Sequence, residues 1–589
     1  MVNKLLVELH NHLLCLGFKR TQVRHIPADS PILMLNKSSG FYVKVYKTDG
    51  GDFKIALWFS GDPHLQLPFA YVISRPEQYS GKLIPHINHG YFLCYLQTLE
   101  ADWNPNDLEG TLRVVDFQIQ QTLDNAVQQI NAVTLADVEL EGEFAAYWSA
   151  SEALYLLTEK SSELTCQLTK PTDSDASSTY REWLVSGKSQ ESEVNRWMVQ
   201  RQLSSASHPI VTTRVKVRPN KLSGTDWPPR TFKSLLDWLL SVDNSAWSQV
   251  ISHFVNTQVK RRVILLDVHN HATIAAYIQL NTNHVSLERF KRKPGKKNKP
   301  LKYKDVSALL GAKQSVEFFV RLSVTSADRG TVLSRNRKRP EIGDLAKLHI
   351  ALIGCGTIGG NLAPLLVRAG AGCGSGRLDL FDADSYMPHN FNRHTLSAEY
   401  FGHNKAVSLK EVLQRSIHLD AKIQAKNDYF SITPEALSTY DIVIDATGRP
   451  PVSKRLAYVV RQLDPVQRPT VIHGYNDGNG RVAKVFVDDG NACYECLHAD
   501  PAFYKNGIDL RFSGIDLLSE KRLSCGSTFV PYDASVSVIS AALMQDAVIQ
   551  TLEEKRLWTY NEVRVDGERS RRPLTLKVSA NCRICHGQD

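Results

Sequence analysis

LHIALIGCGTIGG, residues 348–360, is the stretch that decides the fold of this chain. An apolar strand pattern runs directly into the spacing G-x-G-x-x-G, formed by Gly354, Gly356 and Gly359, and a helix pattern follows. The glycines let the backbone turn tightly and approach phosphate, while the helix N-terminus supplies N–H donors and a positive field. The stretch predicts a strand–turn–helix unit that binds a nucleotide, without identifying which nucleotide.

The sequence around this turn alternates strand and helix patterns from about residue 326 onward. Strands are predicted at RLDLFDAD, DIVIDATG and PTVIHGYN, and a helix at NLAPLLVRAGA. Strands that alternate with helices indicate a parallel, doubly wound α/β sheet. We expect this sheet to form a domain of residues 326–589.

Charged residues after these strands separate two classes of nucleotide enzyme. Asp382 and Asp384 end the second strand, where an acid can bind ribose hydroxyls, so on this evidence alone a dinucleotide oxidoreductase stays open. Further along, the chain adds Asn390, Arg393, Lys405 and Asp445. Hydride transfer has no need of that set, because the nicotinamide carries the chemistry. Splitting a triphosphate does need cations for the pyrophosphate charge and a carboxylate for Mg²⁺, which favours ATP.

The glycine turn, DADSYMPHNFNRH, Lys405 and DIVIDATG occur in an order that resembles the ThiF/MoeB superfamily of adenylating enzymes, which includes ubiquitin-activating enzymes. The resemblance covers roughly residues 335–589. It implies that Asp384 binds ribose, that Asn390, Arg393 and Lys405 bind the phosphates, and that Asp445 holds Mg²⁺. It also implies a homodimer through the adenylation domain, in which either Arg335 or Arg337 reaches the partner's nucleotide.

Two C-x-x-C pairs predict a metal site in the same domain. CYEC and CRIC supply four thiolates, from Cys493, Cys496, Cys582 and Cys585. Four thiolates form a closed tetrahedral Zn²⁺ site, which pins distant segments together. Because such a site has no open coordination position, we assign it a structural role. Adenylating enzymes of this superfamily often carry such a pair of motifs.

Cys525 is the candidate nucleophile of this domain. It lies in a Ser/Gly-rich stretch shortly after Lys521 and Arg522, whose positive charge favours the thiolate. A cysteine placed there can take an acyl group from an adenylate and form a thioester, and its late position resembles that of the activating-enzyme cysteine. We interpret four other cysteines as packing residues, namely Cys15, Cys166, Cys355 and Cys373.

Residues 1–150 predict a compact α+β domain. A helix at about residues 4–16 precedes strands at FYVKVY, KIALWFS and FAYVIS, an irregular stretch with Cys94, and the helix LRVVDFQIQQTLDNAVQQI. This order resembles ubiquitin-conjugating enzymes, whose His-Pro-Asn, cysteine and Trp-x-Pro marks match His86-Ile87-Asn88, Cys94 and Trp103-Asn104-Pro105. The resemblance implies that Cys94 accepts an acyl group.

A conjugating-like domain ahead of a ThiF-like domain resembles the fused enzymes of bacterial anti-phage CBASS operons, and residues 151–325 would be their linker domain. This implies a protein substrate, the C-terminus of a cGAS-like nucleotidyltransferase, which is activated by ATP, passed from Cys525 to Cys94 and joined to an amine. Two alternatives stay open: a sulfur-carrier adenylyltransferase whose first domain only recruits the carrier, and an ATP-binding scaffold without turnover.

Length and composition agree with a multidomain enzyme. The 589 residues are too many for one hydrophobic core, and 42% hydrophobic with 22% charged residues is typical of globular protein. The first residues fit neither a secretory signal nor a membrane span, so we expect a cytoplasmic protein without a membrane partner.

Residues 289–304 hold nine Lys or Arg, equal to the whole net charge of +9. One such basic loop is typical of a solvated hairpin tip, and we do not expect nucleic acid as a partner.

Overall fold

A computed structural model of the chain describes residues 2–26, 31–34, 40–88, 91–96, 101–132, 140, 144–159, 163–172, 181–257, 259–283, 285, 287, 302–524 and 527–586. Its internal contacts divide the chain into two compact units. The first unit comprises Met1–Gln190 and Gln202–Ser326, and the second comprises Glu191–Arg201 and Ala327–Asp589. Of the basic segment 289–304, residues 289–301 lie outside the described residues.

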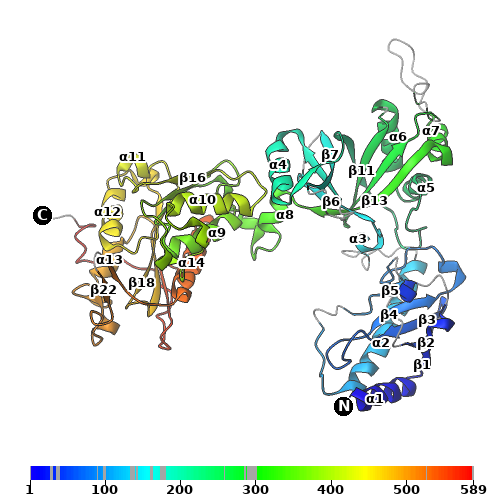
Figure 1. The fold of residues 1–589 in the computed structure, drawn as a ribbon, viewed down its shortest axis with the longest axis horizontal. Helices are drawn as coiled ribbons and strands as arrows, with labels where there is room; N and C mark the ends of the chain where they lie inside the picture. The colour runs from blue at the N-terminus through cyan, green and yellow to red at the C-terminus, as the bar shows by residue number, and fades with distance from the viewer. Residues whose placement is uncertain are drawn as a thin grey trace, which may run out of the picture. The chain divides into compact units, whose positions relative to one another are not determined.

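A five-stranded antiparallel sheet in the order β1-β2-β3-β4-β5 opens the first unit (Figure 1). Helices α1 and α2 pack on it, and Leu13, Leu112 and Ile119 of these helices share a core cluster with Phe53 and Ile55. The helix and the antiparallel meander predicted from the sequence are thereby confirmed. The elements are α1 (Val2–Cys15), β1 (Lys19–Thr21), β2 (Phe41–Thr48), β3 (Gly51–Trp58), β4 (Phe69–Ser74), β5 (Phe92–Leu93) and α2 (Leu108–Asn131).

An eight-stranded mixed sheet in the order β10-β11-β12-β13-β6-β8-β7-β9 forms the rest of the first unit. One face of the sheet is covered by α5, α6 and α7, whose Leu235, Ile251 and Val306 cluster with strand residues such as Ile264 and Ile278. The elements are α3 (Phe144–Tyr147), β6 (Glu152–Leu156), β7 (Leu164–Pro171), β8 (Glu182–Gly187), β9 (Leu203–Ser205), β10 (Ile210–Val217), α5 (Phe232–Val242), α6 (Asn244–Thr257), β11 (Arg261–Val268), β12 (Thr273–Leu280), α7 (Tyr303–Gly311) and β13 (Val316–Ser326).

Helix α4 (Glu191–Gln200) comes from the middle of residues 151–325 but belongs to the second unit. The guanidinium of Arg196 donates to the carbonyl of Leu419 and to Asp420, and Gln200 donates to Ile417 O at 3.0 Å. The ring of Trp197 lies 5.1 Å from that of His418. One segment of the predicted linker is thus packed against the loop between α10 (Lys405–Ser416) and β16 (Ile423–Lys426) of the α/β domain that follows it.

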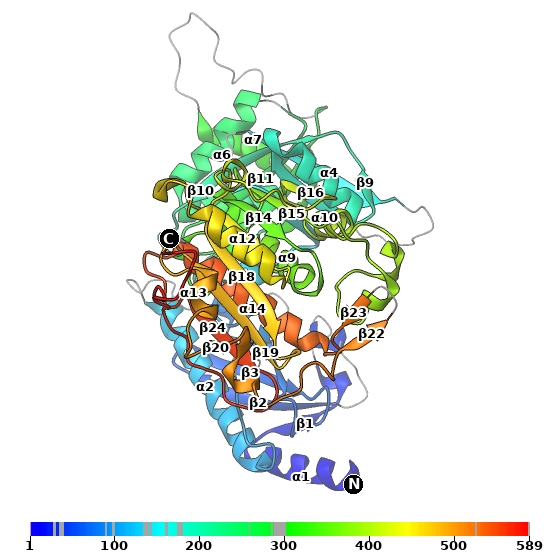
Figure 2. The same ribbon diagram turned by 90° about the vertical axis from the view of Figure 1, so that its left-hand side faces the viewer.

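The second unit is built on a seven-stranded sheet in the order β16-β15-β14-β17-β18-β19-β24. The strands from β16 to β18 are parallel, as predicted, whereas β19 and β24 add an antiparallel edge that the sequence patterns did not predict. Alternate residues of β14 belong to two hydrophobic cores on opposite faces of the sheet. Ile350 and Leu352 pack with α9, α10 and α14, while Ala351 and Ile353 pack with α11 and α12. Both faces are therefore covered by helices (Figure 2), which confirms the doubly wound α/β class.

The elements of the second unit after α4 are α8 (Arg329–Ser334), β14 (His349–Ile353), α9 (Thr357–Arg368), β15 (Arg377–Phe381), α10 (Lys405–Ser416), β16 (Ile423–Lys426), α11 (Pro434–Leu437), β17 (Ile442–Asp445), α12 (Pro450–Val460), β18 (Thr470–Asp477), β19 (Val482–Asp488), α13 (Tyr494–His498), β20 (Tyr504–Lys505), β21 (Ile508–Asp509), β22 (Arg522–Ser524), β23 (Ser527–Phe529), α14 (Ala534–Ile549) and β24 (Tyr560–Arg564). The winding of this sheet reverses between β14 and β17, because the chain moves outward from β14 to β16 and then returns to β17 on its other side. Ligands of open parallel sheets bind at such a reversal, beyond the carboxyl ends of the strands.

One helical segment, Ala534–Leu552, is long and apolar enough by length and composition alone to cross a membrane. In the second unit this segment is a core element. Its Ala541, Met544 and Val548 are fully buried and pack in the same cluster as α9 and the central strands. The apolar character of α14 therefore has an explanation inside the fold.

A buried charged network joins the antiparallel edge to the loops that follow it. Lys484 on β19 is fully buried, and its Nζ donates to Asp477 Oδ2 at 2.6 Å, Asp509 Oδ2 at 2.7 Å and the hydroxyl of Tyr504 at 2.7 Å. Asp509 also accepts from Arg511 at 2.7 Å. A buried charge is tolerated when such partners satisfy it, and removing one partner leaves the others uncompensated.

We expect Lys484→Met to destabilise the second unit by about 3–5 kcal/mol, because Asp477 and Asp509 lose the cation that compensates their burial. The matched control is Lys454→Met, because Lys454 pairs with Glu495 at 3.1 Å but is about half exposed; such a pair contributes about 0–1 kcal/mol. Urea unfolding of the full chain, followed by fluorescence, measures both. Equal unfolding midpoints for the two variants would show that the Lys484 network does not stabilise the unit.

Candidate active site

The glycine turn after β14 has the geometry that its sequence predicts. Gly354 has a φ of +88° and donates its N–H to Phe381 O at 2.8 Å. A Cβ on Gly359 would lie 1.9 Å from Gly354 O, so only glycine allows α9 to start this close to the strand. Gly356 is the N-cap of α9 and offers no side chain, which leaves the first N–H groups of the helix open to an anion.

The acids after β15 fix the turn from its other side. Asp382 Oδ2 accepts the N–H of Cys355 at 2.7 Å, and its Oδ1 accepts the N–H of Asp384 at 2.8 Å. Asp384 is two-thirds exposed and accepts from Lys405 Nζ at 3.1 Å. The two acids are thus not equivalent: Asp382 holds the glycine turn, and Asp384 presents a carboxylate toward solvent. Their predicted ribose role stays a prediction.

Two adjoining pockets lie beyond the carboxyl ends of β14, β15 and β17. The first is largely apolar and is lined by Phe381, Phe430, Ile432 and Val452, which suits a flat aromatic ring. The second is cationic, with Arg393, Lys405 and Lys521 in its wall, which suits phosphate groups. The residues lining both pockets are Gly356, Lys405, Ala446 and Thr447. An apolar pocket joined to a cationic one matches a nucleoside triphosphate.

Arg393 is held at the cationic pocket by contacts with residues that come much later in the chain. Its guanidinium lies 4.4 Å from the centre of the Tyr532 ring and donates to Val530 O at 3.3 Å. Its Nε is buried without a hydrogen-bond partner among the described residues. Asn390 also lines this pocket, but its side-chain oxygen accepts the N–H of Met387 at 3.0 Å. Tyr532 was not singled out from the sequence, since only the fold brings it to Arg393.

Asp445, the predicted Mg²⁺ ligand, is buried beneath these pockets and lines neither of them. Its Oδ1 accepts from the N–H and hydroxyl of Thr447 at 3.1 and 2.7 Å, and its Oδ2 accepts from Ser453 Oγ at 2.5 Å and His473 Nδ1 at 2.9 Å. Burial alone would raise its pKa, but these hydrogen bonds lower it. Both oxygens are thus engaged by protein donors, a poor fit to a cation ligand.

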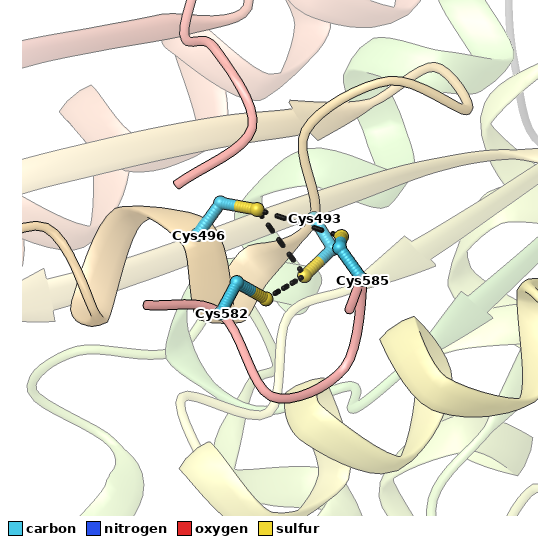
Figure 3. A group of neighbouring side chains, drawn as sticks. All are labelled: Cys493, Cys496, Cys582 and Cys585. Carbon is cyan, nitrogen blue, oxygen red and sulfur yellow. Dashed lines mark hydrogen bonds between the residues drawn. The ribbon is translucent and has the colours of Figure 1, made fainter. Parts of the chain in front are cut away.

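The four cysteines of the C-x-x-C pairs converge as predicted (Figure 3). Cys493 Sγ lies 3.4 Å from that of Cys582 and 3.8 Å from that of Cys496, and Cys496 Sγ lies 3.6 Å from that of Cys585. Four sulfurs bound to one zinc at about 2.3 Å stand about 3.8 Å apart in a tetrahedron, so the cluster fits zinc. It joins α13 to the C-terminal segment.

The other cysteines divide by burial. Cys166, Cys355 and Cys373 are buried in apolar clusters, and burial raises the pKa of each thiol, that of Cys373 to about 11. These three are packing residues, as predicted. Cys15 is exposed, so its interpretation as a packing residue was wrong. It occupies the last position of α1, where the sequence pattern alone did not reveal which face points outward.

Cys94 follows β5 at the edge of the first sheet. It is half-buried, and its N–H donates to His86 O at 2.8 Å. The backbone N–H of Asn88 donates to Phe92 O at 3.0 Å, and the side-chain oxygen of Asn88 accepts the Phe92 N–H at 3.0 Å. Ile87, in the place of the proline, is buried in the core with Leu93. The backbone of Cys94 is therefore held by a hydrogen-bonded frame formed by residues 86–92.

Trp103 and Pro105 are anchored on one loop residue. The indole of Trp103 donates to His64 O at 2.9 Å, and His64 Nδ1 lies 2.6 Å from Pro105 O.

Cys525 lies outside the described residues, but β22 and β23 on its two sides pair antiparallel, and Lys521 just before them lines the cationic pocket. Of the two candidate arginines, Arg335 is exposed, and Arg337 donates to Gly343 O.

Comparisons with known proteins agree with this division. Residues 20–157 match the model of prokaryotic E2 family B, and residues 333–583 match that of the ThiF family. An ATP-dependent ubiquitin transferase-like protein, Cap2 of Vibrio cholerae serotype O1, is 48% identical over 98% of this chain and 99% of its own length. Cap2 of Escherichia coli is 43% identical over the same shares. The adenylyltransferase and sulfurtransferase MOCS3 of Arabidopsis thaliana is 29% identical over 27% of this chain and 33% of its own.

Fold and site thus define an E2-like domain joined to a ThiF-family adenylating domain on one chain. The chain belongs to the Cap2 family of ATP-dependent ubiquitin transferase-like proteins. It is therefore an enzyme that combines ubiquitin-activating-like and ubiquitin-conjugating-like domains, and the recognition made from the sequence motifs is confirmed.

Because the cysteine cluster fits zinc, we expect the purified protein to contain zinc in an equimolar amount and Cys582→Ser to lose most of it. Loss of the metal should also lower the thermal unfolding temperature of the second unit, since the site joins α13 to the C-terminal segment. Elemental analysis and calorimetry measure the two effects. Cys166→Ser, at a buried cysteine outside the cluster, should keep its zinc; an equal loss from both variants would argue against a four-cysteine site.

Proposed function

We propose that this enzyme activates the C-terminal carboxylate of a protein with ATP and passes it through two cysteines to an amine. The observation that supports this most is the pair of joined pockets at the reversal of the sheet, with Lys521 in the cationic wall shortly before Cys525. ATP would place its adenine and ribose in the apolar pocket, beside Asp384, and its phosphates beside the cations and the open start of α9.

In the first step a carboxylate oxygen of the substrate attacks the α-phosphorus of ATP, and pyrophosphate leaves. Negative charge grows on the leaving group, and Arg393 and Lys405 in the wall of the cationic pocket would stabilise it. Mg²⁺ would accompany ATP as a counter-ion. The thiolate of Cys525 then attacks the carbonyl carbon of the adenylate, AMP leaves, and a thioester forms.

In the second step the Cys94 thiolate attacks the thioester, and the Cys525 thiolate leaves. A substrate amine then attacks the Cys94 thioester, gives up its proton, and releases the Cys94 thiolate as the amide forms. The E2-like domain supplies the frame around Cys94 described above. Having both cysteines on one chain gives the second transfer a high effective concentration.

The family resemblance implies which partners the enzyme has, and we include them in this proposal. The substrate would be the C-terminus of a cGAS-like nucleotidyltransferase in antiviral defence in the cytoplasm, and the enzyme would form a homodimer through its adenylation domain. One of Arg335 and Arg337 would reach the partner's nucleotide. The zinc cluster would be structural, because its four thiolates fill a tetrahedral coordination sphere.

The relay makes distinct predictions for its two cysteines. With ATP and a cGAS-like nucleotidyltransferase, we expect Cys94→Ala to accumulate a thiol-sensitive adduct on Cys525 and to form no amide product. We expect Cys525→Ala to form no adduct while it still exchanges pyrophosphate, because adenylation precedes the thiol step. Non-reducing gels and isotope exchange measure these outcomes.

Arg393→Ala should lower the rate of pyrophosphate exchange by about a hundredfold, since it removes a cation that stabilises the leaving pyrophosphate.

Cys15→Ala is the matched control, since Cys15 is an exposed cysteine far along the sequence from both candidates. It should behave as the unchanged protein in every assay. Thiol-sensitive adducts in both Cys94→Ala and Cys525→Ala would exclude the relay. Normal product from Cys94→Ala would favour a sulfur-carrier adenylyltransferase, and nucleotide binding without any pyrophosphate release would favour a scaffold.

A further inference from the structure

The loop after β17 forms part of both walls of the nucleotide site, although its own contacts point inward. Ala446 and Thr447 line both pockets, Gly448 lines the cationic one and Arg449 the apolar one. The loop turns sharply, with a φ of +62° at Gly448. Thr447 Oγ1 accepts the N–H of Arg449 at 3.1 Å, which closes the turn. Something must hold this turn in place for the pockets to keep their shape.

Asp445 is the residue from which the turn is held. Its carboxylate receives the N–H and the hydroxyl of Thr447 on one oxygen, so it binds the first half of the turn by two hydrogen bonds. The other oxygen receives Ser453 of α12 and His473 of β18. The exposed fraction of Asp445 is 1%, and its bonds connect three separate elements.

The network extends toward the cysteine cluster. His473, which donates to Asp445, contacts the ring of Tyr494, and Tyr494 stands between Cys493 and Cys496 in the sequence. The centre of the His473 ring lies 5.0 Å from that of Tyr494 and 6.1 Å from that of Phe486. Asp445 and His473 therefore connect the loop that lines the pockets to helix α13, which carries Cys496 of the cysteine cluster.

We propose that Asp445 is a positioning residue, which shapes the turn of residues 446–449 around the nucleotide, and is not a ligand of Mg²⁺. The inference rests on the nucleotide site of the proposed function. A metal ligand needs a carboxylate oxygen that faces the phosphates, whereas both oxygens of Asp445 are engaged beneath the pocket floor. A positioning role requires the arrangement observed: the Asp445 carboxylate holds the backbone of Thr447, and Ser453 and His473 hold the carboxylate in place.

The two roles differ in how they depend on metal. A ligand contributes to nucleotide affinity only when Mg²⁺ is present, whereas a positioning residue contributes with or without it. The test measures the affinity of the full-length protein for a fluorescent ADP analogue, in Mg²⁺ and in excess EDTA. Asp445→Ala, Asp445→Asn and Ser453→Ala are compared with the unchanged protein, and thermal unfolding shows that each variant is folded.

We expect Ser453→Ala to lower the affinity by about tenfold in both conditions, the effect of one lost hydrogen bond to a buried charge. Asp445→Ala should lower it at least as much in both conditions, because it removes all four hydrogen bonds of the carboxylate. Asp445→Asn should lose less, because the amide oxygen still accepts from Thr447. Ser438→Ala is the control, since Ser438 is an exposed serine that lines neither pocket. If Asp445→Ala does not fold, Ser453→Ala carries the test alone.

Two results would overturn the positioning role: a loss of affinity in Asp445→Ala that appears only with Mg²⁺, or normal affinity in Ser453→Ala under both conditions. Failure of the proposed function looks different, because the unchanged protein would then not bind the analogue at all.

Discussion

The close approach of the first turn of α9 to the strand end and to the loop after β17 is the constraint on which the enzyme depends. A Cβ at Gly354 would stand 3.1 Å from the backbone of Ala446, and a Cβ at Gly359 would overlap Gly354 O. The first contact exists because the sheet reverses its winding between β14 and β17, which places both loops at one edge, whereas the second is local to the glycine turn. The same reversal puts the start of α9 beside the cations of the second pocket. The fold and the shape of the two pockets are therefore set by one backbone arrangement.

The antiparallel edge of the sheet complements this parallel centre. Strands β19 and β24 carry buried charges, and the network of Lys484 fastens the segment around Asp509 to them. The cysteine cluster fastens the C-terminal segment to α13. Tyr532, which packs on Arg393, belongs to the part of the chain that lies between these two attachments. The edge thus holds in place a segment that completes the cationic pocket, and the segment also carries the candidate nucleophile Cys525.

Local patterns predicted much of this fold, because strand alternation and the glycine spacing report directly on backbone geometry. The strand FAYVIS is β4 without a shift, and the four cysteines meet as their spacing indicates. Three features could not be predicted. The partners of Lys484 depend on the antiparallel edge, which no local pattern marked. The direction of the Asp445 carboxylate depends on Ser453 and His473 in other elements. The exposure of Cys15 depends on which face of α1 meets the sheet.

The substitution of Ile87 for proline illustrates how the E2-like domain meets the same demand by other contacts. Proline would fix the backbone before Asn88 through its ring, whereas Ile87 is fixed by burial, at 5% exposure, against Leu93. Asn88 then closes the turn through its side chain and its backbone, both bonded to Phe92. The turn brings His86 O to the N–H of Cys94. The side-chain oxygen of Asn88 accepts the Phe92 N–H, and the amide nitrogen is the donor of this side chain, so a hydrogen bond from the Asn88 side chain to a thioester oxygen must come from that nitrogen.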